Sequence, residues 1–172
     1  MRRSVALCIT LCFMLLLSGC GFHLRNGHEL PRQLQRVYFT AANPDDIVST
    51  ELRDTLTSLN IKLVDTPQQA AYTLELSRSV TTHSRANLNN TSRAATLTYQ
   101  QTINVAIIDN KTQKTVVSSN FSASVSQLLN QNQIMTANTS SLATQSLPHD
   151  LVTHIFIWLT TSKVHDALNS QH

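Results

Sequence analysis

The sequence has 172 residues, of which 13 are Lys or Arg and 10 are Asp or Glu, and its formal net charge is +3. Arg2 and Arg3 lie in an apolar leader, so the 153 residues from position 20 onward carry 11 basic and 10 acidic side chains, a balance that removes the main argument for nucleic-acid binding. Ser, Thr, Asn and Gln fill 61 of these 153 positions, which indicates a hydrated, weakly charged surface on a chain long enough for one domain with a real core.

Residues 1–19 are typical of an export signal. The run from Val5 to Leu17 is almost wholly apolar, and its length of about 13 residues is short of the roughly 20 that a membrane-spanning helix needs. Leu17-Ser18-Gly19-Cys20 resembles the lipobox of bacterial lipoproteins, in which the cysteine receives a diacylglycerol before cleavage makes it residue one. Removal of the leader leaves Cys20 with no second cysteine to pair with. We therefore expect lipidation at Cys20, and Gly21 in place of Asp favours transfer to the outer membrane, on its periplasmic side.

The segment after the lipid site predicts a tether, a strand and a helix. Residues 20–35 show no periodicity, whereas 36–41 read as a short strand. Asn43-Pro44-Asp45-Asp46 supplies a cap residue, a first-turn proline and two acids suited to a helix start. Asn60 is suited to the left-handed residue that ends the helix, and residues 61–64 begin a second strand region. The predicted apolar stripe of this helix is Val48, Leu52, Leu56 and Leu59.

Three longer stretches alternate between apolar and polar residues, which is typical of half-buried strands. Their outward positions are mostly Ser, Thr, Asn and Gln, and Asp109-Asn110-Lys111 provides a turn between the last two. We expect the last three strands to form an antiparallel meander. The predicted inner faces are Tyr72, Leu74, Leu76 and Val80, then Leu97, Tyr99, Ile103, Val105 and Ile107, then Val117, Phe121, Ala123 and Val125.

The last part of the chain predicts a second helix. Residues 131–145 have weak helical character, Leu147-Pro148 interrupts it, and Ser146 can cap the restart with Asp150 in the first turn. Residues 151–159 carry a broad apolar stripe, and 163–172 fade into a tail. The predicted architecture is α+β: two helices packed on a mixed, mainly antiparallel four-stranded sheet in the order β-α-β-β-β-α, as a single domain over residues 36–162.

The sequence contains little that indicates a catalytic or cofactor-binding site. Only Gly21 and Gly27 follow the leader, so neither a phosphate-binding glycine loop nor a nucleophile elbow can be formed. Acylation of Cys20 leaves no thiol nucleophile and no thiolate metal site. None of the seven histidines has the spacing of paired helical ligands, and Asp150 with His154 reads as a surface pair. We therefore expect that the protein is not an enzyme and that it binds no cofactor and no metal.

One charge pattern stands out. Between Glu75 and Asp109 the chain holds Arg78, Arg85 and Arg93 and no acidic residue. Guanidinium groups bind phosphate through paired donors, so these arginines are candidate ligands for an anionic amphiphile or a phosphosugar. The alternative is that they are solvated and discourage pairing at a strand edge.

Several motifs together resemble the LPS-assembly lipoprotein family, LptE. The most specific is Cys20-Gly21-Phe22-His23-Leu24-Arg25 at the start of the mature chain, followed by Leu30-Pro31 before the first strand. Residues 49–56, with the sequence STELRDTL, lead to Leu63-Val64-Asp65 in the same pattern. The likeness extends to about Leu159, through Thr98-Tyr99-Gln100 and Asn132-Gln133.

The resemblance implies a two-helix, mixed four-stranded domain that enters the LptD β-barrel as a plug, assists its assembly and binds lipopolysaccharide. It also implies that Arg85 and Arg93 correspond to basic residues near the second hairpin, whereas Ala137 and Asn138 stand where the family has a second basic group.

Two other classes remain open. One is a stand-alone envelope lipoprotein that serves as accessory or pilot of another transport or secretion complex. The other is a lipid-anchored hydrolase, which the missing nucleophile context disfavours. Weak surface charge is a poor basis for solubility, so either a partner covers much of the domain or its amides and hydroxyls suffice.

Overall fold

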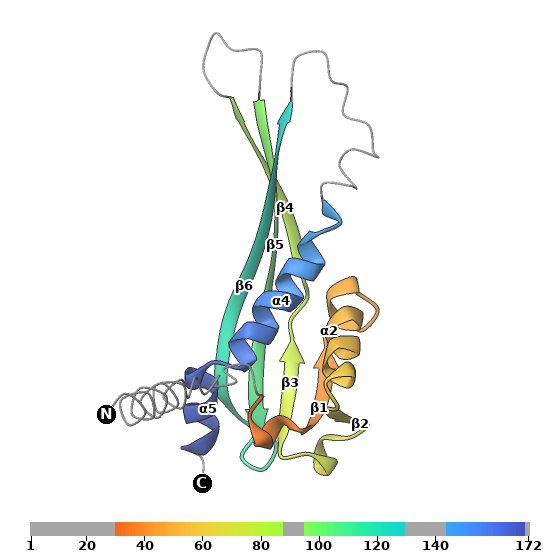
Figure 1. Cartoon of the computed structure of the whole chain (residues 1–172), viewed down its shortest axis with the longest axis vertical. Coiled ribbons are helices and arrows are strands. Elements are labelled where there is room, and N and C mark those ends of the chain that lie inside the picture. The colour runs from red at the N-terminus through yellow and green to blue at the C-terminus, as the bar shows by residue number, and fades with distance from the viewer. Residues whose placement is uncertain (1–29, 88–94, 130–143, 171–172) are drawn as a thin grey trace, which may run out of the picture.

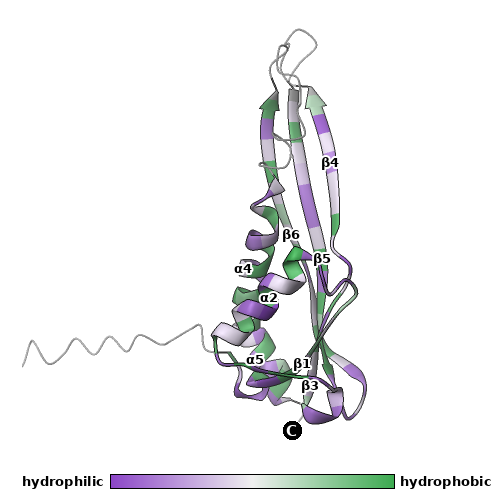
Figure 2. Ribbon diagram, turned by 90° about the vertical axis from the view of Figure 1, so that its right-hand side faces the viewer, coloured by the Kyte–Doolittle hydropathy of each residue, from purple (hydrophilic) through white to green (hydrophobic). Residues whose placement is uncertain are grey.

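The computed structural model describes residues 30–87, 95–129 and 144–170, which form one mixed β-sheet with α-helices packed on one of its faces (Figures 1 and 2). The strands are β1 (Arg36–Ala41), β2 (Lys62–Val64), β3 (Tyr72–Leu76), β4 (Val80–Asn87), β5 (Ala95–Asp109) and β6 (Lys114–Leu129). The helices are α2 (Ile47–Ser58), α4 (Leu147–Leu159) and α5 (Ser162–Asn169), with the short 3-10 helices η1 (Arg32–Leu34) and η2 (Pro67–Gln69). None of these helices is both long and apolar enough to cross a membrane.

Strand β5 organises the sheet. It pairs antiparallel with β6 along one edge and with β3 and then β4 along the other, while β1 lies parallel between β2 and β3. Strands β4, β5 and β6 therefore continue past the other three as a projecting arm, formed by β4, residues 95–102 and residues 122–129 (Figure 1). The opposite end of the sheet, which we call the base, contains η1, the start of β1, β2, η2 and the β5–β6 turn.

Among the described residues, one hydrophobic cluster lies between the helices and the lower part of the sheet. Helix α4 packs on β5 and β6 and against α2, and every side chain of the cluster lies between Leu34 and Leu168. Burial of this apolar surface is the main term that stabilises the fold. The side chains that are at most 2% exposed include Val48, Leu52, Leu56, Leu74, Leu76, Val105, Ile107, Leu151, Ile155 and Leu159.

The predicted α+β class, with a mixed and mainly antiparallel sheet, is confirmed. The described part has six strands where four were predicted and three α-helices where two were predicted. The prediction of a tail from residue 163 is wrong, because α5 covers these positions and buries Val164 and Leu168 completely. Two apolar residues one turn apart form a weak pattern in a sequence, and contact with β6 stabilises this helix.

Helix α2 begins later than predicted. Asp46, and not Asn43, caps it: one carboxylate oxygen of Asp46 accepts a hydrogen bond from the Ile47 N–H at 2.9 Å, and the other accepts one from the Ser79 hydroxyl. Asn60 takes the predicted left-handed conformation, with φ at 61°. The predicted burial of Leu59 is wrong, since this side chain is 45% exposed.

Removal of the Asp46 carboxylate should destabilise the protein. We expect Asp46→Ala to lower the free energy of unfolding by about 1–2 kcal/mol, because it deletes the helix cap and the bond from Ser79. The matched control is Asp45→Ala at an exposed neighbouring position, which should change stability by less than about 0.5 kcal/mol. Urea unfolding followed by circular dichroism measures both, and equal losses would contradict the assignment of the cap.

A bulge separates β3 from β4. Leu76 faces Val105 and Val80 faces Thr102, so the three residues 77–79 lie opposite only two residues of β5. The Ser77 N–H donates to the Asn104 carbonyl and the Asn104 N–H donates to the Ser77 Oγ, both at 2.9 Å. The extra residue turns Val80 to the side away from the helices, where it is 50% exposed. Its predicted place on the inner face is therefore wrong.

Candidate interaction surface on the sheet

The side of β4, β5 and β6 that is turned away from the helices carries uncharged polar side chains. The register places Thr102 beside both Val80 and Ser122, so the even-numbered residues of β4, of β5 up to Asn104 and of β6 from Ser118 onward share this side. We call it the polar face, and the described residues of these strands place no Asp, Glu, Lys or Arg on it. Its members are Val80, Thr82, Ser84 and Ala86 of β4, Thr96, Thr98, Gln100, Thr102 and Asn104 of β5, and Ser118, Asn120, Ser122, Ser124, Ser126 and Leu128 of β6.

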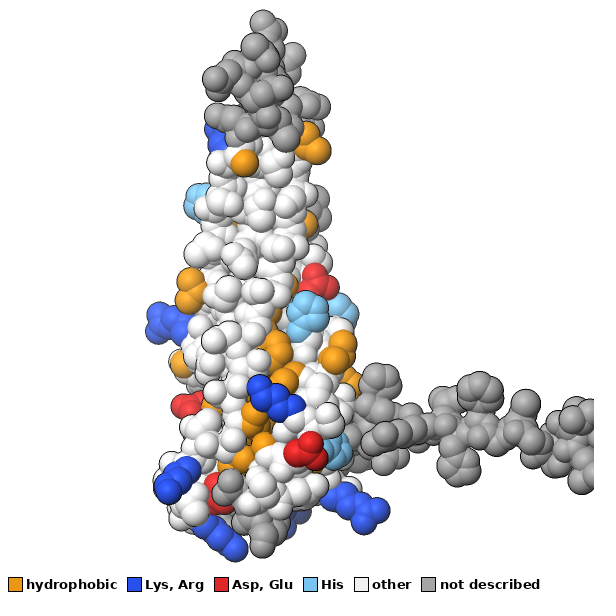
Figure 3. Space-filling model, turned by 90° about the vertical axis from the view of Figure 1, so that its left-hand side faces the viewer, with side chains coloured by type: hydrophobic (Ala, Val, Ile, Leu, Met, Phe, Trp, Pro, Cys, Tyr) orange, Lys and Arg blue, Asp and Glu red, His pale blue; other side chains and the backbone are white. Residues whose placement is uncertain are grey.

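Cross-strand hydrogen bonds order part of the polar face. The Asn104 side-chain amide donates to the Asn120 side-chain oxygen at 2.9 Å and to the Ser119 carbonyl at 3.3 Å. Nearer the end of the arm, the hydroxyls of Thr98 and Ser126 lie 2.9 Å apart. Pairs of this kind stabilise a sheet modestly and leave further donor and acceptor sites toward solvent. In Figure 3 the arm is a largely uncharged column.

The alternation in the sequence predicted this surface correctly. Ser118, Asn120, Ser122, Ser124 and Ser126 are all exposed, as expected from their outward positions. On the opposite side of the sheet, Ile103, Val105 and Ile107 are at most 3% exposed. When one side of a strand is buried, the side to which each residue points is fixed, because a slip by one residue would expose all the apolar side chains of the strand.

A shallow groove crosses the polar face at the bulge. Its volume is about 530 Å³, and its lining includes Arg78, Gln100, Asn104 and Asn120. Arg78 supplies a single cationic group among amide and hydroxyl donors. The groove therefore suits a neutral polar partner or one anionic group, and its residues offer hydrogen bonds more than charge.

The structure separates the arginines that the sequence groups together. Arg78 is exposed at the bulge, whereas Arg85 lies on β4 opposite Leu97, on the side of the sheet that faces the helices. Seven residues of extended chain place them roughly 23 Å apart. Arg93 lies outside the described residues, as do Cys20, Ala137 and Asn138. Arg78 and Arg85 thus cannot hold one phosphate group together.

An ion pair that the sequence did not predict joins α2 to α4. The Nδ1 atom of His149 lies 2.5 Å from Oε1 of Glu51, with the two residues 98 positions apart in the chain. The hydrogen bond to Glu51, together with the charge of Glu51, raises the pKa of His149 above its ordinary value. The sequence predicted a surface pair of Asp150 and His154 here. The ion pair that the structure shows at this end of α4 is formed by His149, and its partner Glu51 lies on α2. No local spacing could have revealed it.

This pair should make stability depend on pH. Because the pKa of His149 is higher in the folded chain, the contribution is complete below the unfolded pKa of about 6.5 and is lost as the pH rises through the folded value. We expect that His149→Gln and Glu51→Gln each reduce the change of the melting temperature with pH between about 6 and 8. His154→Gln on the same helix is the control and should keep the wild-type profile, and a flattening by this control would contradict the assignment.

The described segments contain no candidate metal site. No group of three or more His, Cys, Asp or Glu side chains there is arranged to hold an ion. The features that the described residues do offer are surface features: the polar face, the groove beside Arg78 and the charged base.

Part of the sequence is similar to that of a known protein. No protein-family model matches the chain. Among curated proteins, the LPS-assembly lipoprotein LptE of Pectobacterium atrosepticum is 35% identical over 52 residues, which are 30% of this chain and 28% of that protein. The match thus spans less than a third of that relative's length.

Solved structures match over much more of the chain. A minor lipoprotein from Acinetobacter baumannii superposes with a TM-score of 0.57 at 18% identity, over 74% of this chain and 91% of that one. Lipoprotein B from Nitrosomonas europaea superposes with a TM-score of 0.59 at 17% identity, over 88% of this chain and 97% of that one. The chain shares the fold of these two lipoproteins. The resemblance seen in the sequence is confirmed, and at these identities the likeness to the solved structures is one of fold.

The motifs on which the sequence resemblance rests can be located in this fold. Residues 49–56 lie in α2, where Leu52 and Leu56 are core side chains and Glu51 holds His149. Thr98 and Gln100 lie on the polar face of β5, and Tyr99 between them points to the other side. The motifs in the described part of the chain therefore serve the core, one ion pair and the polar face.

Proposed function

We propose that this LptE-like chain is an envelope lipoprotein that inserts its arm into an outer-membrane β-barrel, LptD, and supports the assembly of lipopolysaccharide at the cell surface. The role is one of binding and not of catalysis. The observation that carries the proposal is the polar face, an uncharged surface that extends over three strands. The short sequence match to an LPS-assembly lipoprotein supports the role in lipopolysaccharide assembly.

The chemistry of the polar face fits the interior of a barrel. The lumen of a large outer-membrane barrel is polar and wet, so an apolar plug would gain little there. Burial of a charged side chain costs several kcal/mol unless it is paired, whereas hydroxyl and amide groups need only a hydrogen-bond partner or a bridging water. Rows of Ser, Thr, Asn and Gln allow the arm to enter with a small desolvation penalty.

The anchor belongs to the same proposal. Residues 1–19 act as the signal and Cys20 carries the acyl chains. The predicted bounds of the tether, residues 20–35, are wrong at their end, because η1 (Arg32–Leu34) belongs to the folded domain and Leu34, 4% exposed, is part of its core. The acyl chains attach the domain to the periplasmic side of the outer membrane. Acylation by more than one chain makes such an attachment stable, since each buried methylene contributes about 0.8 kcal/mol.

Binding of lipopolysaccharide is assigned to Arg85, near the end of the arm, and to Arg93, with Arg78 as a separate contact at the groove. We expect charge reversal of both Arg85 and Arg93 to Glu to weaken binding of purified lipopolysaccharide by at least about tenfold, since hydrogen bonds to charged groups contribute roughly 1.5–3 kcal/mol. Substitution of both by Lys should retain part of the affinity. Unchanged binding by the Glu variant, measured by surface plasmon resonance, would remove these residues from the site.

The partner is tested by purification from native membranes. An affinity-tagged chain, solubilised from outer membranes in mild detergent, should co-purify with one large β-barrel protein. Depletion of the chain should leave newly made lipopolysaccharide undelivered to the surface. If the chain purifies without a barrel, or with the components of a secretion complex, the pilot or accessory role replaces this proposal.

A further inference from the structure

The charges of the described residues are distributed unevenly along the long axis of the molecule. The base has five basic side chains and two acidic ones, Asp65 and Asp109, while the remainder has four basic and seven acidic side chains. The described part therefore carries a charge of +3 at the base and −3 elsewhere. The five basic residues of the base, all exposed, are Arg32, Arg36, Lys62, Lys111 and Lys114.

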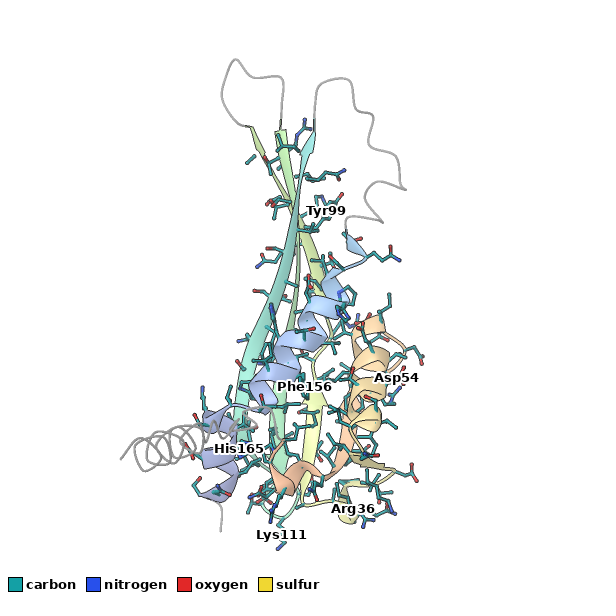
Figure 4. All side chains as sticks on the ribbon, in the orientation of Figure 1. Arg36, Asp54, Tyr99, Lys111, Phe156 and His165 are labelled. Carbon is teal, nitrogen blue, oxygen red and sulfur yellow. The ribbon has the colours of Figure 1, made fainter. Side chains whose placement is uncertain are left out.

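Sheet topology brings these residues together. Arg36 faces Lys62 where the parallel strands β1 and β2 begin. Tyr72 of β3 faces Asp109, so the β5–β6 turn with Lys111 and Lys114 lies at the same end. Figure 4 shows Arg36 and Lys111 at this end, and Figure 3 shows Lys and Arg side chains gathered there. Residues from three segments that are distant in the sequence thus form one cationic surface.

An amphipathic groove adjoins this surface. It has a volume of about 610 Å³ and lies between η1, the end of α2 and α4. Leu59, which is 45% exposed, and Phe156 contribute apolar walls, while Arg32 contributes a guanidinium group. Apolar walls beside a guanidinium suit the boundary between a phosphate headgroup and its acyl chains.

We propose that the base docks on a membrane surface that bears anionic phospholipid headgroups. Basic side chains near such a surface contribute about 1 kcal/mol each. The seven acidic side chains outside the base all lie off the described part of the arm, on or beside the helices and on β3, and their repulsion from an anionic surface favours contact through the base. The described chain begins at residue 30, in the base, about ten residues from Cys20. If Cys20 is acylated, as the proposed function holds, the anchor emerges within roughly 35 Å of this surface.

The test uses a chain that begins at Gly21 and has no acyl group, so that its outcome is independent of lipidation. This chain keeps every residue of the hydrophobic cluster, which lies between Leu34 and Leu168. Co-sedimentation is measured with phosphatidylcholine vesicles, with and without phosphatidylglycerol, at low ionic strength and at about 0.15 M salt, where the Debye length is about 8 Å. Thermal melts establish that each variant is folded.

The decisive variants change three lysines of the base. With Lys62, Lys111 and Lys114 all replaced by Gln, binding to phosphatidylglycerol vesicles should fall on the order of 100-fold, whereas replacement of all three by Arg should leave it close to the wild-type value. Binding should also weaken with salt and be absent on pure phosphatidylcholine. The proposal is overturned if the wild-type chain does not bind phosphatidylglycerol vesicles at low salt, binds both vesicle types equally, or is unaffected by the three Gln substitutions. None of these outcomes bears on the barrel partner.

Discussion

Replacement of Cys20 by serine should abolish incorporation of a clickable palmitate and remove the protein from the outer-membrane fraction. The reason is chemical: the serine hydroxyl cannot form the thioether to diacylglycerol. Without the acyl chains the free energy of insertion is lost, at about 0.8 kcal/mol for each methylene that would have been buried. In-gel fluorescence of labelled cells and sucrose-gradient fractionation measure the two effects, and we expect the label to fall to background.

The leader supplies matched controls for this experiment. Cys8→Ser and Cys12→Ser make the same change within the apolar run of the signal, and both should leave labelling and fractionation as in the wild type. If the Cys20→Ser protein remains labelled, or fractionates with the outer membrane as before, then the chain is not a lipoprotein anchored at this residue.

The largest loss of stability is expected at the centre of the helical layer. Leu52→Ala should lower the free energy of unfolding by about 2–5 kcal/mol, because Leu52 is fully buried between α2 and the sheet and its truncation leaves a cavity. Much of the net stability of a domain of this size would be lost. Denaturant unfolding at neutral pH measures the difference from the wild type.

Leu59→Ala is the matched control for this substitution. Leu59 continues the same apolar stripe but lies 45% exposed just past the end of α2, so its truncation should cost less than about 1 kcal/mol. Similar losses for the two variants would show that α2 is not packed as described.

The sequence predicted the sheet best where one side of a strand is buried. Ile103, Val105 and Ile107 alternate with polar residues over a long stretch, and only one facing of β5 buries them. The polar face follows from the same alternation, so this part of the candidate site could be predicted residue by residue. The sequence did not reveal which residues of β4 point away from the helices. Residues 77–79 contain neither Gly nor Pro to mark a bulge, and the alternation of apolar and polar residues continues through Val80.

The errors at helix ends have a different origin. Asn43 and Asp46 are both good cap residues within one tetrapeptide, and a tertiary contact decides between them: the Ser79 hydroxyl donates to Asp46. Helix α5 shows only Val164 and Leu168 as apolar positions of its stripe, and their complete burial depends on the rest of the domain. Local patterns carry no information about such contacts.

The charged surfaces were the least predictable part of the site. Arg78 and Arg85 are close in sequence, but an extended chain carries them apart. The cationic base gathers Arg32, Lys62 and Lys111 from segments that no local motif connects, and the pairing of β1 with β2 and of β3 with β5 brings them together. The net charge after the leader is close to zero, so the composition gives no sign of a cationic surface at the base.

Photo-crosslinking in living cells tests the central claim most directly. A photoreactive residue is placed at Thr98 or Ser122 on the polar face, and at Thr112 in the β5–β6 turn of the base as the control. If the arm lies inside a barrel, both polar-face positions capture one and the same large outer-membrane β-barrel protein and Thr112 does not. Absence of that adduct at Thr98 and Ser122, or an equal yield of it at Thr112, would contradict the account.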